Sequence, residues 1–126
     1  MHNVDKFVNV IYMKTSRNIS WIRAALRDFE DFPSDVQSDM LDALTLAAEG
    51  EMSGKAKPFK GIDGGVFVIA LRYRGDAFRT IYAVKIGVDV WVIHAFQKKS
   101  KSGIKTPQTD VELIRERLKR LKDALK

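Results

Sequence analysis

The sequence predicts an α+β domain in which two helices precede a small, mainly antiparallel sheet and a further helix follows it. Three observations indicate this class. Apolar residues recur at helical spacing in the first half of the chain, strict alternation replaces that spacing near residue 66, and helical spacing returns near the end. A chain of 126 residues is long enough to bury one core and too short for two, so we treat residues 1–126 as a single domain.

The chain opens with an N-terminal extension, residues 1–18, in which the apolar stretch Phe7 to Met13 has the length of a short strand. The segment "ISWIRAALRDFEDFP" then predicts the first helix, because its apolar residues lie three and four positions apart. They are Trp21, Ile22, Ala25, Leu26 and Phe29. Pro33 ends this helix, since the residue before a proline is pushed out of the helical region.

A second helix is expected to begin at Ser34, which forms a capping-box pattern with Gln37. Gly50 supplies its stop signal. Two helices joined so closely are typical of an antiparallel pair. The following segment, "EMSGKAKPFKGIDGG", reads as a loop because of its Gly, Pro, Lys and Ser content.

Three strands are predicted next, over Val66 to Arg74, Ala77 to Lys85 and Val90 to Phe96. Residues alternate between two faces in the first two strands. In the first strand Arg72 and Arg74 lie on the face of Val68 and Ala70, and in the second Arg79 lies on the face of Ile81 and Ala83. The third strand is almost wholly apolar, which favours burial on both faces. The turns "RGD" and Gly87 to Asp89 are short, and short turns indicate an antiparallel meander.

The last helix is expected to open at a second capping box, Thr109 with Glu112. Its apolar residues step three and four positions apart and form one narrow stripe: Val111, Ile114, Leu118, Leu121 and Leu125. Packing on the parent sheet is the expected use of this stripe. A partner-binding helix is the alternative.

The positive charge of the protein is segregated. Residues 1–96 carry twelve Lys and Arg against twelve Asp and Glu, whereas residues 97–126 carry ten against four, so the whole net charge of +6 belongs to the last thirty residues. Such an uneven distribution favours a polyanionic partner. The alternative is a solvated basic helix beside a lysine-rich loop.

Several classes of chemistry are excluded by what the sequence lacks. There is no cysteine, which removes disulfides and thiolate sites and is typical of a reducing cytoplasm, and there is no apolar run of membrane-spanning length. The two histidines, His2 and His94, lie far apart in the sequence, so we expect neither a metal site nor any other cofactor. Nucleophile elbows and phosphate-binding P-loops are also missing.

Cations and hydrogen-bonding aromatics instead gather on and beside the predicted sheet. They are Arg72, Arg74, Arg79, Tyr82, His94, Gln97, Lys98, Lys99 and Lys101. Such groups suit a phosphodiester, because guanidinium and ammonium donors stabilise the negative charge of a pentacoordinate phosphorus. RNA carries its own nucleophile, the 2′-hydroxyl, so alignment and proton transfer are all that the protein needs to supply. Each residue also has an ordinary alternative, as a solvated charge or, for Tyr82 and His94, as a satisfied core residue.

Two segments together resemble the HigB-type, phage-derived toxins of the RelE/ParE superfamily. They are "KPFKGIDGGVFVIALRYRGDAFRTIYAV" and "VWVIHAFQKKSKSGIKTPQTDVELIRERLKR", and the resemblance covers about residues 55 to 122. It implies a helical hairpin packed on a twisted sheet, cytoplasmic cleavage of messenger RNA on the ribosome without a metal, and a helix-turn-helix antitoxin as partner.

The resemblance also implies roles for individual residues. Arg79 and Lys98 match the phosphate-stabilising cations of the superfamily, and Arg72 closes the preceding strand at a corresponding place. We further expect Tyr82 or His94 to assist proton transfer, and Arg72, Arg74, Gln97, Lys99 and Lys101 to contact RNA. One departure is that Val68 and Ala70 stand where related nucleases carry lysines, so the general base stays open among Lys98, Lys99, Tyr82 and His94. A gyrase-inhibiting toxin of the ParE branch and a non-catalytic RNA-binding module are therefore alternatives.

Overall fold

The computed structural model describes residues 16–62, 64–98 and 106–125 and has eight helices and strands within them. In chain order they are β1 (Ile19–Trp21), α2 (Arg23–Glu30), α3 (Ser34–Ala48), β2 (Ala56–Pro58), β3 (Val66–Tyr73), β4 (Asp76–Ala83), β5 (Val90–Lys98) and α4 (Gln108–Ala124). The strands form one sheet in the order β1-β5-β4-β3-β2, antiparallel except for the parallel pair β1 and β5. The α+β class and the antiparallel meander are confirmed.

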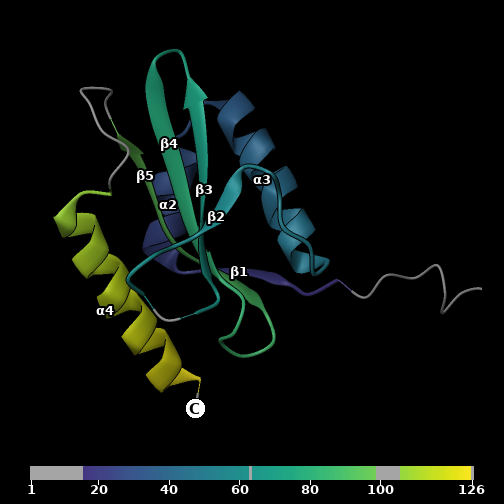
Figure 1. The fold of residues 1–126 in the computed structure, drawn as a ribbon, viewed down its shortest axis with the longest axis vertical. Coiled ribbons are helices and arrows are strands. Elements are labelled where there is room, and N and C mark those ends of the chain that lie inside the picture. The colour runs from purple at the N-terminus through teal and green to yellow at the C-terminus, as the bar shows by residue number, and fades with distance from the viewer. Residues whose placement is uncertain (1–15, 63, 99–105, 126) are drawn as a thin grey trace, which may run out of the picture.

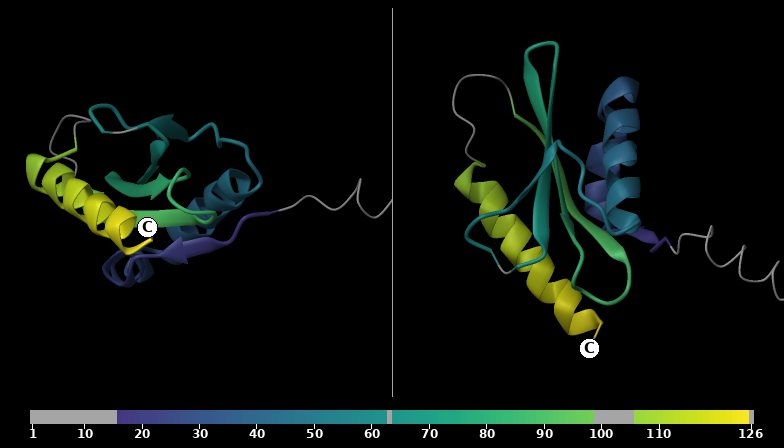
Figure 2. Two further views of the ribbon diagram at one scale, coloured as in Figure 1. Left: turned by 90° about the horizontal axis from the view of Figure 1, so that it is seen from below. Right: turned by 45° about the vertical axis from the view of Figure 1, so that its right-hand side comes forward.

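The helices cover the two faces of the sheet unequally. Figures 1 and 2 show α2 and α3 on one face and α4 alone on the other. The core on the α2 and α3 side contains Phe29, Met40, Leu44, Ile69 and Tyr82, among others. The core under α4 is smaller and is built from Val66, Ile81, Ala83, Ile86, Ile93, Ile114, Leu118 and Leu121. The predicted stripe on the last helix therefore does pack on the sheet.

The hairpin between β3 and β4 follows the predicted alternation. Its "RGD" turn places Arg74 and Gly75 at φ +52° and +88°, and two successive positive φ values belong to the tight turns that match the twist of a hairpin. On β5 a bulge interrupts the ladder, because Ile81 pairs with His94 whereas Tyr82 pairs with Val92. Ile93 is the extra residue at the bulge.

Two short strands were not predicted. The first helix was expected to include Trp21, but Ile19–Trp21 forms β1 and pairs with Val90–Val92, and the helix begins only at Arg23. The hydroxyl of Ser20 fixes this pairing by donating to Asp89 at 2.6 Å. Within the expected loop, Ala56–Pro58 pairs with β3 as an edge strand. Lysine and proline are tolerated in an edge strand, because no further strand needs to pair with its backbone groups. The same residues are common in loops, so the sequence of this strand resembled a loop.

Both predicted capping boxes are wrong. The helices α3 and α4 begin directly after Pro33 and Pro107, and neither helix has a side-chain cap. Each proline has φ near −55° and ψ 147°, so its ring presets the chain direction from which the helix starts. Gln37 reaches back to the carbonyls of Glu30 and Phe32, and not to Ser34.

The predicted stop of the second helix is confirmed, because α3 ends at Ala48 and Gly50 has φ +86°. The apolar stretch Phe7 to Met13 lies outside the described residues. Of the helices in the described ranges, none has the length and apolar character needed to cross a bilayer.

Candidate functional site

A patch of cations lies on the α4 face of the sheet, at the end that α4 leaves uncovered. The register places Arg72, Ala77 and Lys98 side by side on β3, β4 and β5. The neighbouring row on this face consists of Ala70, Arg79 and Phe96. Directly paired residues point to the same face, and adjacent strands lie about 4.8 Å apart, so the outer members of each row are about 10 Å apart at their Cα atoms. We call Arg72, Arg79 and Lys98 the cationic patch.

Arg79 is the buried member of the cationic patch. Only 7% of the residue is exposed, and a single hydrogen bond, from Nη1 to the Thr106 hydroxyl at 3.3 Å, is recorded for its guanidinium among the described residues. Its Nε is buried and has no hydrogen-bond partner there. Burial lowers the pKa of Arg79, and the positive charge of Arg72 lowers it further. A buried cation with a like charge beside it and an unused donor is suited to bind an anion.

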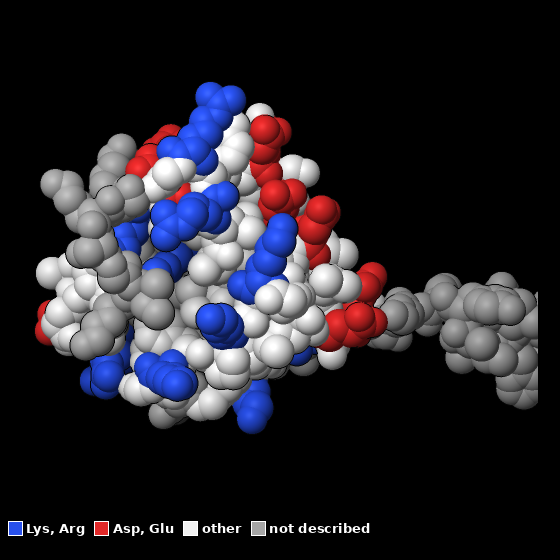
Figure 3. All heavy atoms as spheres, turned by 45° about the horizontal axis from the view of Figure 1, so that its top comes forward, with Lys and Arg blue, Asp and Glu red and all other residues white. Residues whose placement is uncertain are grey.

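Small side chains lie beside the cations of the patch on β3 and β4. Ala70 is exposed next to Arg79 on β3, and Ala77 separates Arg72 from Lys98. Figure 3 shows Lys and Arg side chains spread over this end of the molecule, whereas Asp and Glu gather along one flank. The exposed acidic residues of α3 are Asp35, Asp39 and Asp42. Charge is therefore separated across the surface as well as along the sequence.

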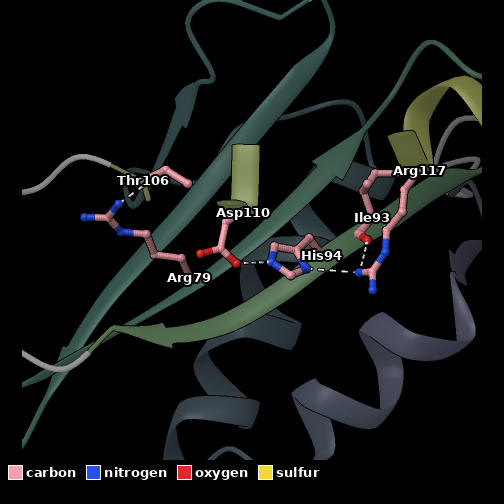
Figure 4. A network of polar contacts seen from close by, with 6 residues as sticks. All are labelled: Arg79, Ile93, His94, Thr106, Asp110 and Arg117. Carbon is pink, nitrogen blue, oxygen red and sulfur yellow. Dashed lines mark hydrogen bonds and ion pairs between the residues drawn. The ribbon is translucent and has the colours of Figure 1, made fainter. Parts of the chain in front are cut away.

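His94 lies under α4 in a network of polar contacts (Figure 4). Its Nε2 is 2.7 Å from Asp110 Oδ1 and its Nδ1 is 3.0 Å from Arg117 Nη1. An arginine has only donors, so Nδ1 must be the acceptor, and the ring proton is then on Nε2 and is donated to Asp110. His94 is 3% exposed and both of its nitrogens are engaged. This arrangement favours a structural role for His94, as an anchor between β5 and α4.

Arg117 completes that anchor at the bulge. The extra residue of a bulge loses its ladder partner, and Arg117 Nη1 donates to the carbonyl of Ile93 at 3.0 Å. Burial lowers the pKa of Arg117, whereas Asp28, Glu116 and Asp110 act to raise it. Arg79 and Arg117 thus have opposite surroundings, because Arg117 lies among carboxylates and acceptors and Arg79 is beside another cation.

The structure brings some of the predicted site residues together and separates others. Arg72, Arg79 and Lys98 share one face. Tyr82 lies on the opposite face, is 1% exposed and stacks on Phe67 with the ring centroids 5.3 Å apart, and its burial raises its pKa. Gln97 also lies on that opposite face, where its side chain donates to Asp76 at 2.8 Å.

The other predicted RNA contacts fall elsewhere. Arg74 is at the tip of the hairpin, with its guanidinium carbon 5.3 Å from the centre of the Tyr73 ring. Lys99 and Lys101 lie outside the described residues. Over the described ranges, no group of three His, Asp or Glu side chains is arranged to hold a metal ion.

Four residues near the patch were missed by the sequence reasoning: Phe96, Thr106, Asp110 and Arg117. Phe96 lies two residues from both His94 and Lys98 in the sequence. In a strand this spacing places all three side chains on one face, and it could have identified Phe96. The other three join β5 or β4 only through tertiary contacts that no local pattern encodes.

The comparisons with known proteins agree with this architecture. The model of the family described as "Phage derived protein Gp49-like (DUF891)" matches residues 27–119. The free state of a mutant Escherichia coli toxin RelE is 20% identical to the chain with a TM-score of 0.56, covering 83% of this chain and 97% of that one. The toxin–antitoxin complex RelBE2 from Mycobacterium tuberculosis gives 17% identity, a TM-score of 0.46, and coverage of 68% and 95%. A search of curated proteins found no match. The fold is that of RelE, with a mostly antiparallel five-stranded sheet and three helices.

Proposed function

We propose that this chain, which belongs to the Gp49-like family of phage-derived proteins, is the toxin of a type II toxin–antitoxin pair and cleaves messenger RNA. The observation that carries the proposal is the buried guanidinium of Arg79, whose Nε has no hydrogen-bond partner among the described residues and which lies beside Arg72 and Lys98 on the part of the face that α4 does not cover. The RelE fold and the positive charge of the last thirty residues support it.

In the proposed reaction the ribose 2′-oxygen attacks the adjacent phosphorus while the bond from phosphorus to the 5′-oxygen breaks. The 2′-hydroxyl loses a proton, the departing 5′-oxygen gains one, and the products are a 2′,3′-cyclic phosphate and a 5′-hydroxyl end. The extra negative charge of the pentacoordinate phosphorus is stabilised by preorganised cations. No metal or other cofactor takes part.

The cationic patch divides this work among its members. Arg79 donates from beneath the phosphate, held in direction by Thr106. Lys98 approaches this phosphate from β5. Arg72, on β3, contacts the neighbouring phosphate, since the Cα atoms of Arg72 and Lys98 are about 10 Å apart. Because Tyr82 lies on the other face and His94 has both nitrogens engaged, we assign proton transfer to Lys98 or to Lys99, and RNA positioning also to Lys101.

Inducing the protein alone in bacteria and mapping RNA ends tests this function. Wild type is expected to arrest growth and to produce new 5′-hydroxyl ends, and Arg79→Ala is expected to abolish both effects. Arg120→Ala is the matched control, since Arg120 is an exposed arginine on α4 whose ion pair among the described residues is with Glu116 of its own helix at 3.5 Å. With purified protein, cleavage should persist in a chelator and stop when the target sugar is 2′-deoxy.

The same experiment separates the rival functions. A toxin of the gyrase-inhibiting type would induce a DNA-damage response and leave transcripts intact, and Ala70 on β3, where a lysine base would otherwise stand, favours this second candidate. An RNA-binding module without activity would leave growth unaffected. Unchanged RNA ends in arrested cells would therefore overturn the nuclease proposal.

The proposed partners are messenger RNA on the ribosome and a cognate antitoxin with a helix-turn-helix domain. An adjacent reading frame of that type, co-expressed with this chain, is expected to restore growth. As a control, cells that lack this reading frame should again stop growing when the chain is induced. Growth arrest that persists when both reading frames are expressed would contradict the assignment.

A further inference from the structure

We infer that Phe96 is a stacking platform for the RNA base next to the phosphate bound by Arg79. This inference rests on the proposed function and extends it, because it names how the base, and not only the phosphate, is held. It concerns a side chain that carries no charge and that does not contact the reacting atoms.

The position of Phe96 on the sheet is the first argument. It is the direct cross-strand partner of Arg79, so both side chains leave the same face of the sheet. Lys98 follows two residues later on that face. Phe96 is partly exposed, whereas its neighbours His94 and Ala95 are buried. An aromatic ring is thus partly open to solvent beside a buried cation.

The support beneath the ring is the second argument. Phe96 stacks on the imidazole of His94, with the ring centroids 5.2 Å apart and the planes inclined by 23°. The imidazole cannot rotate freely, because Asp110 and Arg117 hold its two nitrogens from α4. The ring of Phe96 is therefore fixed in direction before any ligand arrives, which lowers the entropy lost on binding.

The chemistry of single-stranded RNA fits this pair of groups. Proteins that bind single strands combine cations that follow the backbone with aromatic rings on which bases stack, and each such ring is worth about 5- to 140-fold in affinity. Stacking tolerates every base, because each has a π-face. Phe96 is then a positioning residue that places the nucleotide, and Arg79 and Lys98 act on its phosphate.

Binding of uncleavable oligonucleotides to purified full-length protein tests the platform. The probes are a single-stranded 2′-O-methyl RNA and an abasic strand of the same length, which share their phosphates and differ in their bases. Wild type is expected to prefer the RNA by about 5- to 140-fold, and Phe96→Leu is expected to lose that preference. Phe96→Trp should keep it, and the fluorescence added by the new tryptophan, relative to wild type, should be quenched by the RNA and not by the abasic strand.

The outcomes distinguish this inference from the function on which it rests. If Phe96→Leu keeps the preference for bases while Arg79→Ala weakens both probes, the platform is refuted and the anion site stands. If neither probe binds in a manner that depends on Arg79, both proposals fall. If Phe96→Leu does not fold, an absence of quenching in Phe96→Trp still overturns the platform. In single-turnover cleavage, Phe96→Leu should raise KM more than it lowers kcat.

Discussion

The substitution Arg79→Met is expected to abolish RNA cleavage without destabilising the protein. Methionine has an unbranched side chain of similar length, so it fills most of the space of the arginine stem. A residue that is 7% exposed normally supports the fold, and replacing it is then costly. Arg79 is expected to differ because its buried Nε has no hydrogen-bond partner among the described residues.

The magnitude follows from two opposing terms. Removing the buried Nε, which has no partner among the described residues, is expected to stabilise the fold by about 1–3 kcal/mol. Losing the hydrogen bond from Arg79 to Thr106, which is long at 3.3 Å, costs about 0.5–1.5 kcal/mol. The net effect on the free energy of unfolding is therefore between a loss of about 0.5 kcal/mol and a gain of about 2.5 kcal/mol.

The matched control is Arg117→Met, which removes the partly buried arginine of α4 that contacts the same face of the sheet. Arg117 donates to the Ile93 carbonyl and to His94 Nδ1, both at 3.0 Å, and its loss leaves these acceptors buried and unpaired. We expect a loss of about 3–5 kcal/mol in the free energy of unfolding. The same substitution should thus destabilise the protein strongly at Arg117 and little or not at all at Arg79.

Urea unfolding followed by circular dichroism measures both variants, and RNA-end mapping measures their activity. The reasoning is refuted if Arg79→Met loses more than about 2 kcal/mol, since the guanidinium would then be a structural group whose partners lie inside the protein. An Arg79→Met variant that is stable and still cuts RNA would instead remove Arg79 from the site.

Three further predictions concern stability, pH and salt. Leu118→Ala is expected to lower the free energy of unfolding by about 2–5 kcal/mol, because Leu118 is 4% exposed in the core under α4; an effect below 1 kcal/mol in urea unfolding would contradict that packing. Burial raises the pKa of Tyr82 in the folded state, so the unfolded state releases its proton first and stability falls as the pH rises above about 10. Tyr82→Phe should reduce this loss of stability at high pH and leave cleavage unchanged. If the Tyr82→Phe variant folds but does not cleave RNA, Tyr82 belongs to the catalytic site. Arg72→Ala should reduce the salt dependence of RNA binding by about one unit of slope in a plot of log affinity against log salt, and an unchanged slope would exclude a phosphate contact.

The three long strands could be predicted from the sequence because each one separates two different environments. Alternation in β3 and β4 places large apolar residues toward α2 and α3, and the structure has that arrangement at Phe67, Ile69, Phe78 and Tyr82. The near-continuous apolar run of β5 is explained by helices on both of its faces. Burial in a strand leaves a pattern of apolar residues in the local sequence, and the strand can be predicted from that pattern.

The short strands could not be predicted for the opposite reason. The segment Ile19–Trp21 has three residues, and what makes it a strand is its pairing with β5 some seventy positions later. Helical spacing continues through Trp21 because Trp21 and Phe29 contact each other, with ring centroids 4.8 Å apart, from a strand and a helix. The sequence predicted that both residues belong to one apolar set, and it did not predict the strand conformation of Trp21.

The candidate site was predicted in the same partial way. The sequence indicated Arg79 as a charge among apolar residues, and the structure places it among them. It could not indicate that His94 is engaged on both sides, because Asp110 and Arg117 approach from a helix whose docking depends on the whole core. A histidine in an apolar strand has the same local pattern in an active site and in a structural anchor.

The uncovered end of the sheet follows from the residues on a single face of it. At the end of the sheet away from the β3–β4 hairpin, the α4 face carries Val66, Ile81, Ala83 and Ile93. The apolar stripe of α4 buries these residues. Toward the hairpin the same face changes to Arg72, Ala77 and Lys98, where an apolar helix would gain little by packing and would bury charge at a cost. The helix therefore covers only the apolar end, and Arg79 lies where the two halves meet. Burial lowers the pKa of its guanidinium, and the positive charge of Arg72 lowers it further.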